Sequence, residues 1–595
     1  MLTNPRFTLG VIAVALSTVG CGLAADVIAD SDRASDGEAT GASEDAETSV
    51  TALSTTVDTN IAAARPIAPA TGARVTANPP TFHWARPAGV LGARIQICAD
   101  RACSRIEQEL EATGDQVKSN RALSAGVHFY RLFGLGLRAH GAVSSATIPF
   151  IVRRRASSGN VDTSWGSTPD FDGDGYGDLA VTSRRISTAS EARPIDPPRV
   201  VVYEGRAVGR PLSPSTVIDA APGQYSSTPY WIANAGDVDG DGFSDLVLGM
   251  AGEAGHGRVD VFRGSDSGLL SVPAFVLQSP SGSSGFGIVG TGIGDVNGDG
   301  FADIAVAEDG RIVVFHGRQS GGPIASAALL MGNDPSPFGS VAPAGDVNGD
   351  GFADVVVVRT GDPARVEVYG GSPTGLSVNA PMLTISAPSA FGLTAAGAGD
   401  VNGDGFADVA IAASTGALVS PWRVQIHLGK ATGPAASPSI TIAAPAYAGA
   451  KGPQLAAAGD VNGDGFDDLL VGSPETLIGA PTMKPLLTRA ALYFGGVAGP
   501  SSFAVQTFTL PALVSDYGGT FGSTVGAIGD FDRDGYDDLV IGVAQRFTPL
   551  VPMPLVNNYL YVHKGTALRA WATPSFSLKS GDSDTMFGVA LARLH

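Results

Sequence analysis

Short runs of alternating apolar and polar residues, separated by glycine, proline and asparagine, fill most of the chain. A period of two predicts strands with one buried face, so we expect an all-β protein. Between residues 61 and 155 the runs TFHWA, ARIQICA, HFYRLFGLGL and ATIPFIV have this form. They predict a small β-sandwich over 61–155, with Trp84 and Tyr130 in its core.

A second pattern repeats from about residue 160 to residue 595. An acidic, glycine-rich stretch such as GDVNGDGFADVVVV, residues 345–358, leads directly into an apolar run, and it occurs seven times. The first acids of the copies stand 51 to 70 residues apart, at Asp170, Asp237, Asp295, Asp346, Asp400, Asp460 and Asp530. Copies of this length, made of short strands and glycine turns, predict a β-propeller with four strands per blade over 160–595. The last run, MFGVALARLH, is expected to close the ring by completing the first blade.

Each copy carries oxygen-bearing side chains at positions 1, 3, 5 and 9 of the pattern D-x-[DN]-x-[DN]-G-x-x-D. Position 7 would add its backbone carbonyl, and glycine at position 6 permits a sharp turn. Ca²⁺ takes about six to eight oxygen ligands, whereas softer metals prefer nitrogen or sulfur, which the pattern lacks. The loop is not an EF-hand, because position 12 of the first copy is Val181 rather than glutamate. The predicted metal ligands are Asp170, Asp172, Asp174, Tyr176, Asp178, Asp237, Asp239, Asp241, Phe243, Asp245, Asp295, Asn297, Asp299, Phe301, Asp303, Asp346, Asn348, Asp350, Phe352, Asp354, Asp400, Asn402, Asp404, Phe406, Asp408, Asp460, Asn462, Asp464, Phe466, Asp468, Asp530, Asp532, Asp534, Tyr536 and Asp538.

The repeats resemble the FG-GAP repeats of the integrin α-subunit propeller and its bacterial relatives. Strands containing Phe-Gly precede most loops, as in SPFGSVAPAGD and SAFGLTAAGAGD. The resemblance implies a seven-bladed propeller that holds up to seven structural Ca²⁺ ions in hairpins on one face. Arg533 stands at position 4 of the last loop, where the other copies have glycine, and its charge could weaken that site. The segment 61–155 resembles a fibronectin type III or Ig-like module, and a generic β-sandwich of no named family fits its strands equally.

The charge of the chain agrees with ligand acids. At these four positions three loops supply four aspartates each and four loops supply three, so the predicted ligand positions hold 24 of the 57 acidic residues. Seven Ca²⁺ ions would change the formal charge from −19 to about −5. The alternative is that these are soluble glycine-aspartate turns with no ion. An acidic balance excludes nucleic acid as an expected partner, because phosphates would be repelled.

The N-terminus reads as an export segment. Residues 1–20 contain Arg6 and an apolar stretch of signal-peptide length, too short to span a bilayer. The small residues before Cys21 resemble a bacterial lipoprotein signal, which implies lipidation of Cys21; plain secretion without a lipid is the alternative. Residues 21–60 are acidic, lack aromatic residues and are expected to form a disordered tether. Cys98 and Cys103 are expected to form a disulfide in an exported protein.

No catalytic constellation is found in the sequence: the eight histidines are scattered, and no nucleophile elbow or phosphate loop occurs. The leading hypothesis is a non-enzymatic, monomeric binding or adhesion module, exported as an outer-membrane or cell-surface lipoprotein, with a periplasmic or secreted protein as the alternative. A calcium-assisted polysaccharide lyase or hydrolase is the second hypothesis. Long connections at 184–198, 474–488 and 544–558 are expected on one sector of the face opposite the calcium loops, where an unknown protein or glycan would dock.

The third strand of six blades begins with an arginine. These residues either stabilise their own blade or form a basic ring for an anionic partner; they are Arg199, Arg258, Arg311, Arg365, Arg423 and Arg489.

Overall fold

In the computed structural model, every described element is a β-strand. The structure describes residues 53–154, 161–185, 199–207, 213–219, 231–250, 257–283, 285–308, 310–320, 322–325, 338–360, 363–377, 380–387, 393–414, 422–443, 452–473, 489–509, 520–544, 559–568, 570–579 and 584–592. The predicted signal at 1–20, Cys21 and most of the tether lie outside these ranges.

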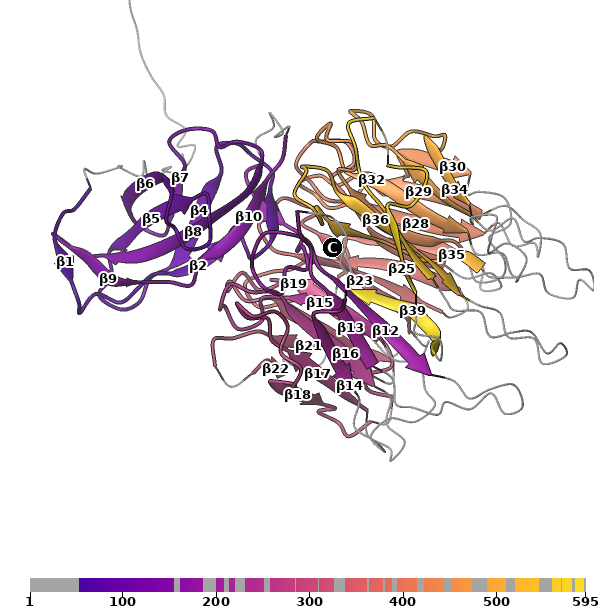
Figure 1. The fold of residues 1–595 in the computed structure, drawn as a ribbon, viewed down its shortest axis with the longest axis horizontal. Helices are drawn as coiled ribbons and strands as arrows, with labels where there is room; N and C mark the ends of the chain where they lie inside the picture. The colour runs from indigo at the N-terminus through magenta and orange to yellow at the C-terminus, as the bar shows by residue number, and fades with distance from the viewer. Residues whose placement is uncertain are drawn as a thin grey trace, which may run out of the picture. The chain divides into compact units, whose positions relative to one another are not determined.

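Two sheets share one core in the N-terminal part (Figure 1). The smaller sheet has the order β2-β4-β7, with bounds Arg65–Ala68, Thr81–Ala85 and Gln116–Lys118. The larger sheet has the path β1-β9-β8-β10-β3-β11, and β5 joins β6 to β8. Its bounds are Val57–Asp58 (β1), Ala73–Val75 (β3), Gly92–Cys98 (β5), Ile106–Thr113 (β6), Gly126–Leu135 (β8), His140–Ser144 (β9), Ile148–Val152 (β10) and Ser164–Trp165 (β11).

The core of this sandwich is aromatic. Strand β4 alternates, so that Phe82 and Trp84 point inward and both are buried. Tyr130 packs edge-on against Phe82, with ring centroids 5.0 Å apart, and donates a hydrogen bond to the Pro69 carbonyl. The two predicted core aromatics, Trp84 and Tyr130, are therefore confirmed as buried.

The disulfide and the first described residues bear on two of the sequence predictions. Cys98 and Cys103 form a disulfide, as expected. Strand β1 pairs in parallel with β9, and the Ser54 amide donates to the Glu111 carboxylate. The end of the segment assigned to the tether is thus part of the sandwich sheet. The sequence missed it because a two-residue strand has too little pattern to detect.

The remaining described strands form seven four-stranded antiparallel sheets, one for each copy of the repeat. We number them blades 1 to 7, each named by the loop that precedes its second strand. Blade 1 contains β39 (Asp584–Ala592), β12 (Leu179–Arg185), β13 (Arg199–Tyr203) and β14 (Thr216–Asp219); blade 2 contains β15 (Trp231–Gly236), β16 (Asp245–Met250), β17 (Arg258–Phe262) and β18 (Phe275–Gln278). Blade 3 contains β19 (Gly290–Gly294), β20 (Asp303–Glu308), β21 (Arg311–His316) and β22 (Ile324–Ala325); blade 4 contains β23 (Phe338–Gly345), β24 (Asp354–Arg359), β25 (Ala364–Tyr369) and β26 (Leu383–Ala387). Blade 5 contains β27 (Leu393–Gly399), β28 (Asp408–Ser414), β29 (Trp422–His427) and β30 (Ile440–Ala443); blade 6 contains β31 (Gln454–Gly459), β32 (Asp468–Ser473), β33 (Arg489–Tyr493) and β34 (Gln506–Thr509); blade 7 contains β35 (Thr520–Gly529), β36 (Asp538–Ala544), β37 (Tyr559–His563) and β38 (Phe576–Lys579).

Burial along the strands explains the run of valines that follows the loop of blade 4. All six residues of β24, DVVVVR, are buried, so the second strand of this blade is covered on both faces. Fourth strands instead alternate, as in β18 and β30, because one of their faces meets solvent. A continuous apolar run is what a strand covered on both faces requires.

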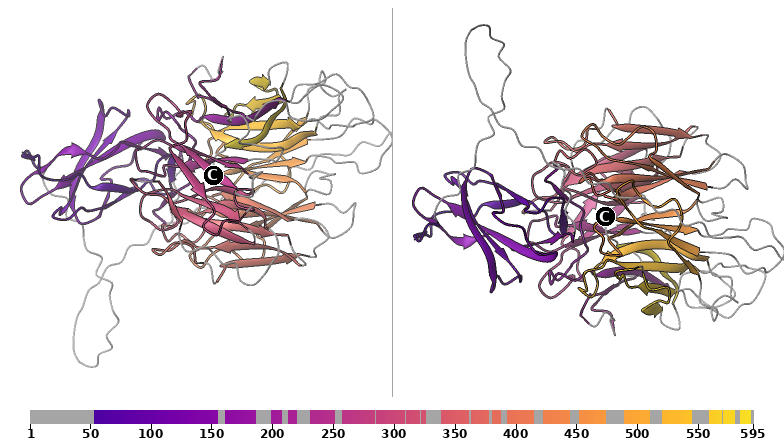
Figure 2. Two further views of the ribbon diagram at one scale, coloured as in Figure 1. Left: turned by 90° about the horizontal axis from the view of Figure 1, so that it is seen from below. Right: turned by 90° about the horizontal axis from the view of Figure 1, so that it is seen from above.

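The ring is closed by the C-terminal strand. Strand β39 pairs antiparallel with β12, and both views of Figure 2 show the yellow strand beside the purple one. The last loop is joined to the first by a hydrogen bond from the Gly177 amide to the Asp530 carbonyl. The predicted all-β propeller and its closing strand are confirmed.

Candidate metal centres

Each acidic loop is a tight turn wrapped around its first aspartate. In loop 3, Asp295 Oδ1 accepts the amides of Gly298 and Asp299 at 2.7 and 3.1 Å, and Oδ2 accepts the Gly300 amide at 2.6 Å. Asp299 in turn accepts the Phe301 amide at 3.0 Å. The same bond from the position-6 amide to position 1 recurs in the other loops. These bonds turn the side chains at positions 1, 3 and 5 toward a common centre.

The aspartate at position 9 joins the loop to the end of the third strand. Asp303 Oδ2 accepts the Val296 amide at 3.0 Å, and Oδ1 accepts the Gly317 amide at 2.9 Å. The equivalent residue is fully buried in all seven loops. The sequence predicted a metal ligand at position 9, and in the structure this aspartate also links the loop to the end of the third strand by hydrogen bonds. The glycine that follows each third strand in the sequence could have indicated this link, because its amide is the donor to the position-9 aspartate.

In three loops, carboxylates converge to the separation that a metal ion needs. One oxygen from each of three aspartates lies within 4.8 Å of the others in loops 1, 2 and 7; the groups are Asp170, Asp172 and Asp178; Asp237, Asp239 and Asp245; and Asp530, Asp532 and Asp534. The loops with asparagine at position 3 keep the same turn. In loop 3, for example, Asn297 Oδ1 accepts the Asp299 amide at 2.9 Å.

Burial makes the loop carboxylates costly to ionise. Burial first, and neighbouring carboxylates to a smaller extent, together raise the pKa of Asp237, Asp295, Asp460 and Asp530 to about 7. The pKa values of Asp346 and Asp400 rise to about 6 for the same first reason. Every position-9 aspartate also has a raised pKa because it is desolvated. The loops are thus built to receive positive charge.

Two of the loops with four aspartates carry a base from their own blade. Arg263 pairs with Asp239 at 2.5 Å and with Asp241 at 2.6 Å, and Lys564 pairs with Asp532. Both bases stand directly before the glycine that ends the third strand. Within the described part of the chain, the second oxygens of Asp239 and Asp532 are buried and accept no hydrogen bond. An unsatisfied carboxylate oxygen in a ring of oxygens fits a hard cation.

Loop 1 differs in its charge, and loop 7 in its shape. At the position of Arg263 and Lys564, blade 1 has Glu204, whose pKa is raised by burial and by Asp172. In loop 7, Arg533 replaces the position-4 glycine and lies 5.2 Å over the Tyr176 ring, with its guanidinium donating to the Asp174 carbonyl at 3.2 Å. Its charge therefore points to loop 1 rather than into loop 7.

Neighbouring loops pack on one another. The position-8 amide of each loop donates to the position-1 carbonyl of the preceding loop, as from Ala353 to Asp295 at 3.0 Å. In loops 3 and 4, the position-7 aromatic ring of the later loop covers the position-4 glycine of the earlier one. A Cβ on Gly298, whose φ is +70°, would lie 2.5 Å from Phe352. Position 4 is therefore glycine for two reasons, its left-handed backbone and the ring above it.

Comparison with known sequences identifies the repeat. The FG-GAP-like repeat family matches residues 170–248, 295–357, 346–411 and 400–471, and the FG-GAP repeat matches residues 521–551. Each match but the last begins at the first aspartate of a loop. The chain is an FG-GAP repeat protein. Its propeller is like that of integrin α subunits.

Known relatives of this FG-GAP protein match it over part of their length. Integrin alpha-5 of Xenopus laevis is 36% identical over 124 residues, which cover 20% of this chain and 11% of that protein. Phosphatidylinositol-glycan-specific phospholipase D of Mus musculus is 26% identical over 441 residues, 61% of this chain and 51% of that protein. The solved rhamnogalacturonan lyase YesW aligns at 13% identity and a TM-score of 0.35 over 85% of this chain and 92% of that one, and so low a score carries no argument.

Several of the third-strand arginines pair with acids of their own blade. Arg258 binds Asp260 at 2.6 Å, and Arg311 lies 3.1 Å from Glu308. Arg199 lies 3.1 Å from Asp219 on the neighbouring strand. These pairs favour the interpretation that the arginines stabilise blade edges. In the described ranges, no helix is long and apolar enough to cross a bilayer.

Proposed function

We propose that this FG-GAP protein is an exported, cell-surface, calcium-binding module that recognises a partner without catalysis. The observation that carries the proposal is the repeated loop, in which carboxylates converge on one centre and two buried oxygens of the described residues lack a donor. Carboxylate and carbonyl oxygens are the ligands of Ca²⁺. In loop 3 the ion would be held by Asp295, Asn297, Asp299, the Phe301 carbonyl and Asp303, and the corresponding positions would serve in the other loops.

In this proposal calcium is structural. The position-1 and position-9 aspartates already tie the turn to two strands, and an ion would remove the repulsion among their charges. Up to seven ions would stiffen the hairpins around the ring. Binding to the folded state alone would stabilise it by linkage.

The partner in this proposal is a protein or glycan at the cell surface. Long connections at 184–198, 474–488 and 544–558 are expected to meet it, and all of their residues except 184, 185 and 544 lie outside the described residues. The module would act as a monomer, held to a membrane only through a lipid on Cys21. A rigid β-strand scaffold with connections of variable length is suited to the recognition of a partner.

An extracellular enzyme is the alternative, because one relative is named as a phospholipase D. The carboxylates that converge in the described residues belong to the loops, where they are bound to backbone amides. Polysaccharide cleavage or lipid hydrolysis would therefore need other groups. Turnover that a single pocket substitution abolishes would establish the enzyme instead.

Elemental analysis and thermal unfolding of the full chain test the calcium proposal. We expect several bound Ca²⁺ ions per chain and a lower unfolding temperature after chelation, restored by Ca²⁺ and not by Na⁺. A chain free of calcium, with the same stability in chelator, would refute it. Capture from the native cell surface with and without Ca²⁺, followed by a glycan array, would then identify the partner class.

A further inference from the structure

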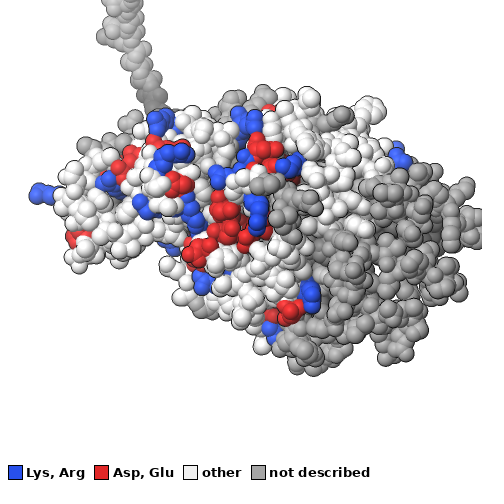
Figure 3. Space-filling view, viewed as in Figure 1, with Lys and Arg blue, Asp and Glu red and all other residues white. Residues whose placement is uncertain are grey.

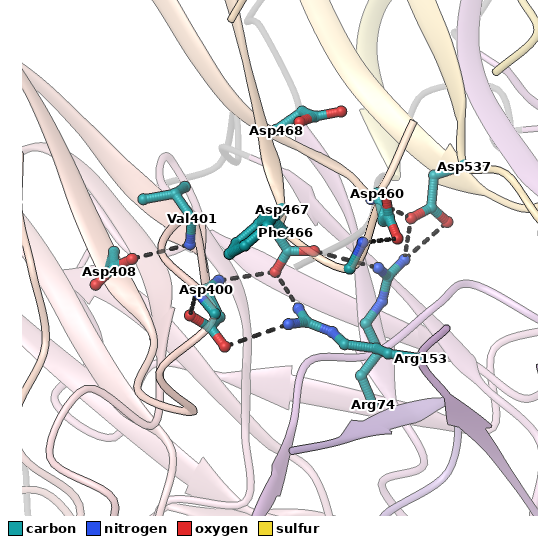
Figure 4. A network of polar contacts seen from close by, with 12 residues as sticks. Arg74, Arg153, Asp400, Val401, Asp408, Asp460, Phe466, Asp467, Asp468 and Asp537 are labelled. Carbon is teal, nitrogen blue, oxygen red and sulfur yellow. Dashed lines mark hydrogen bonds and ion pairs between the residues drawn. The ribbon is translucent and has the colours of Figure 1, made fainter. Parts of the chain in front are cut away.

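Two buried arginines of the sandwich reach into the ring of loops (Figure 4). Arg74 of β3 binds Asp537 through two bonds of 2.7 and 2.8 Å and approaches Asp467 at 3.4 Å. Arg153, directly after β10, binds Asp467 and lies 3.3 Å from Asp400. Arg74 and Arg153 are 6% and 8% exposed, so these are buried ion pairs.

The two acids that receive the arginines are not ligand positions. Asp467 and Asp537 stand at position 8 of loops 6 and 7. The other five loops have small residues there, which are Gly177, Ser244, Ala302, Ala353 and Ala407. The repeat can therefore form its turn without an acid at position 8. Two adjacent copies nevertheless have an aspartate at position 8, and each of these aspartates faces an arginine from outside the repeat. Formation of the turn does not explain them.

Each of these acids also bridges two loops. Asp467 accepts the amide of Asp400 at 2.7 Å, and Asp537 accepts the amide of Asp460 at 2.6 Å. The arginines thus bind carboxylates that are already fixed by the ring. A rigid acceptor reduces the entropy lost when a guanidinium binds.

Further sandwich side chains contact other loops without using position 8. Arg101 lies 3.7 Å over the Phe243 ring and donates to the Gly242 carbonyl at 2.9 Å. Arg65 lies 4.6 Å over the Phe301 ring. Figure 3 shows acidic and basic side chains gathered in the middle of the surface. These contacts are cation–π and carbonyl interactions, which add orientation, whereas the buried ion pairs of Arg74 and Arg153 lie at Asp467, Asp537 and Asp400.

We propose that Asp467 and Asp537 form an intramolecular docking site whose partner is the chain's own sandwich, and that Arg74 and Arg153 hold the sandwich there. The docking does not depend on ions in the loops, because Asp467 and Asp537 lie outside the ligand set. Arg153 also approaches Asp400, which is a ligand position, but removing cations would only leave that carboxylate more available to the arginine. The loop face is therefore covered by the sandwich, and an outside partner must bind elsewhere. Only that last consequence rests on the proposed binding function.

The test is the double substitution Asp467→Ala and Asp537→Ala in the full chain, since alanine already occupies position 8 in loops 3 to 5. It removes both acids that Arg74 binds and leaves Arg153 with Asp400 alone, at 3.3 Å, which strongly disfavours the docked state. Hydrogen exchange should accelerate at least about tenfold in residues 73–75 and 400–405, and small-angle scattering should show a larger maximum dimension. Asp266→Ala removes the same kind of charge from an exposed position of blade 2 and should change neither.

A second variant and a metal-free arm complete the test. Arg74→Met with Arg153→Met should give the same exchange and scattering changes from the sandwich side. The wild type should remain docked after chelation, whether or not calcium proves to be bound. Unchanged exchange and dimensions in both double variants, in a chain whose strand content is retained by circular dichroism, would overturn the proposal. Undocking of the wild type in chelator would overturn it as well, and calcium content measured on the same sample reports separately on the proposed function.

Discussion

A metal-free preparation should become less stable as the pH rises from about 5.5 to 8, which is the reverse of the usual behaviour of a protein rich in paired carboxylates. The reason lies in the position-1 aspartates. Burial raises the pKa of Asp237, Asp295, Asp460 and Asp530 to about 7, whereas an unfolded aspartate ionises near 3.8. The folded state therefore binds more protons than the unfolded state between these two values.

The sign and the size follow from linkage. A carboxyl whose pKa is raised on folding contributes stability that is complete below about 3.8 and is lost as the pH rises through about 7. For one such carboxyl, the change between about pH 5.5 and 8 is about 2 kcal/mol. Asp295 is one of four position-1 aspartates with this value, so the loss should amount to several kcal/mol for the whole ring. Calcium should reverse the trend, because it binds the ionised loops and competes with protons.

Thermal unfolding by circular dichroism measures both arms. The protein is freed of metal with chelator, transferred to metal-free buffers from about pH 5.5 to 8, and unfolded with and without added Ca²⁺. The metal-free midpoint should fall with pH, and the gap between the two curves should widen toward pH 8. A metal-free midpoint that rises across this window would show that the loop carboxylates are not desolvated as argued.

Three further outcomes are expected. Lys564→Met should tighten calcium binding at one site about tenfold, because the ammonium group no longer competes for Asp532. Calorimetry measures this affinity, and an unchanged isotherm would contradict the prediction. Gly298→Ala should lower the free energy of unfolding in urea by roughly 2–4 kcal/mol, and by more than Gly351→Ala does. Both glycines have a positive φ, but only the Cβ added at Gly298 would meet an aromatic ring, so equal losses would refute the steric argument. Removal of residues 584–595 should lower the unfolding temperature and promote aggregation, measured by light scattering, because the edge of β12 loses its partner strand. A soluble product of unchanged stability would count against closure of the ring by β39.

The sequence predicts the propeller because its signals are local and repeated. The run DVVVV that follows the fourth loop specifies a strand buried on both faces, as β24 proves to be, and seven such runs average out the ambiguity of any single one. The turn at positions 1 to 6 is also local, since Asp295 binds amides three to five residues away. Spacing alone therefore places the candidate ligands. Closure by the last strand follows because an open ring would expose two edges.

Contacts between distant segments could not be predicted in the same way. Arg74 and Asp537 are 463 residues apart, and a lone arginine in a β-rich segment has no pattern that names its partner. Asp467 and Asp537 are extra acids at position 8, but the sequence does not show which side chain faces them. The pairing of β1 with β9 was missed for a related reason, because it joins Val57 and Asp58 to a strand more than 80 residues further along the chain.

The comparison of the loops shows that charge, more than ligand identity, is what the repeat holds constant. Loops 3 to 6 combine three aspartates with an asparagine, while loops 2 and 7 combine four aspartates with Arg263 or Lys564. Apart from His316, which lies 3.2 Å from Asp303 in loop 3, both combinations leave three net negative charges among the groups that face one centre. Loop 1 alone keeps four aspartates and adds Glu204 where loops 2 and 7 have a base. The cost of packing carboxylates together rises with each added charge, and a fixed base can take the place of part of a cation in loops 2 and 7. Loop 1 has no such base in its own blade, and the positive charge beside its Asp174 comes from Arg533 of loop 7.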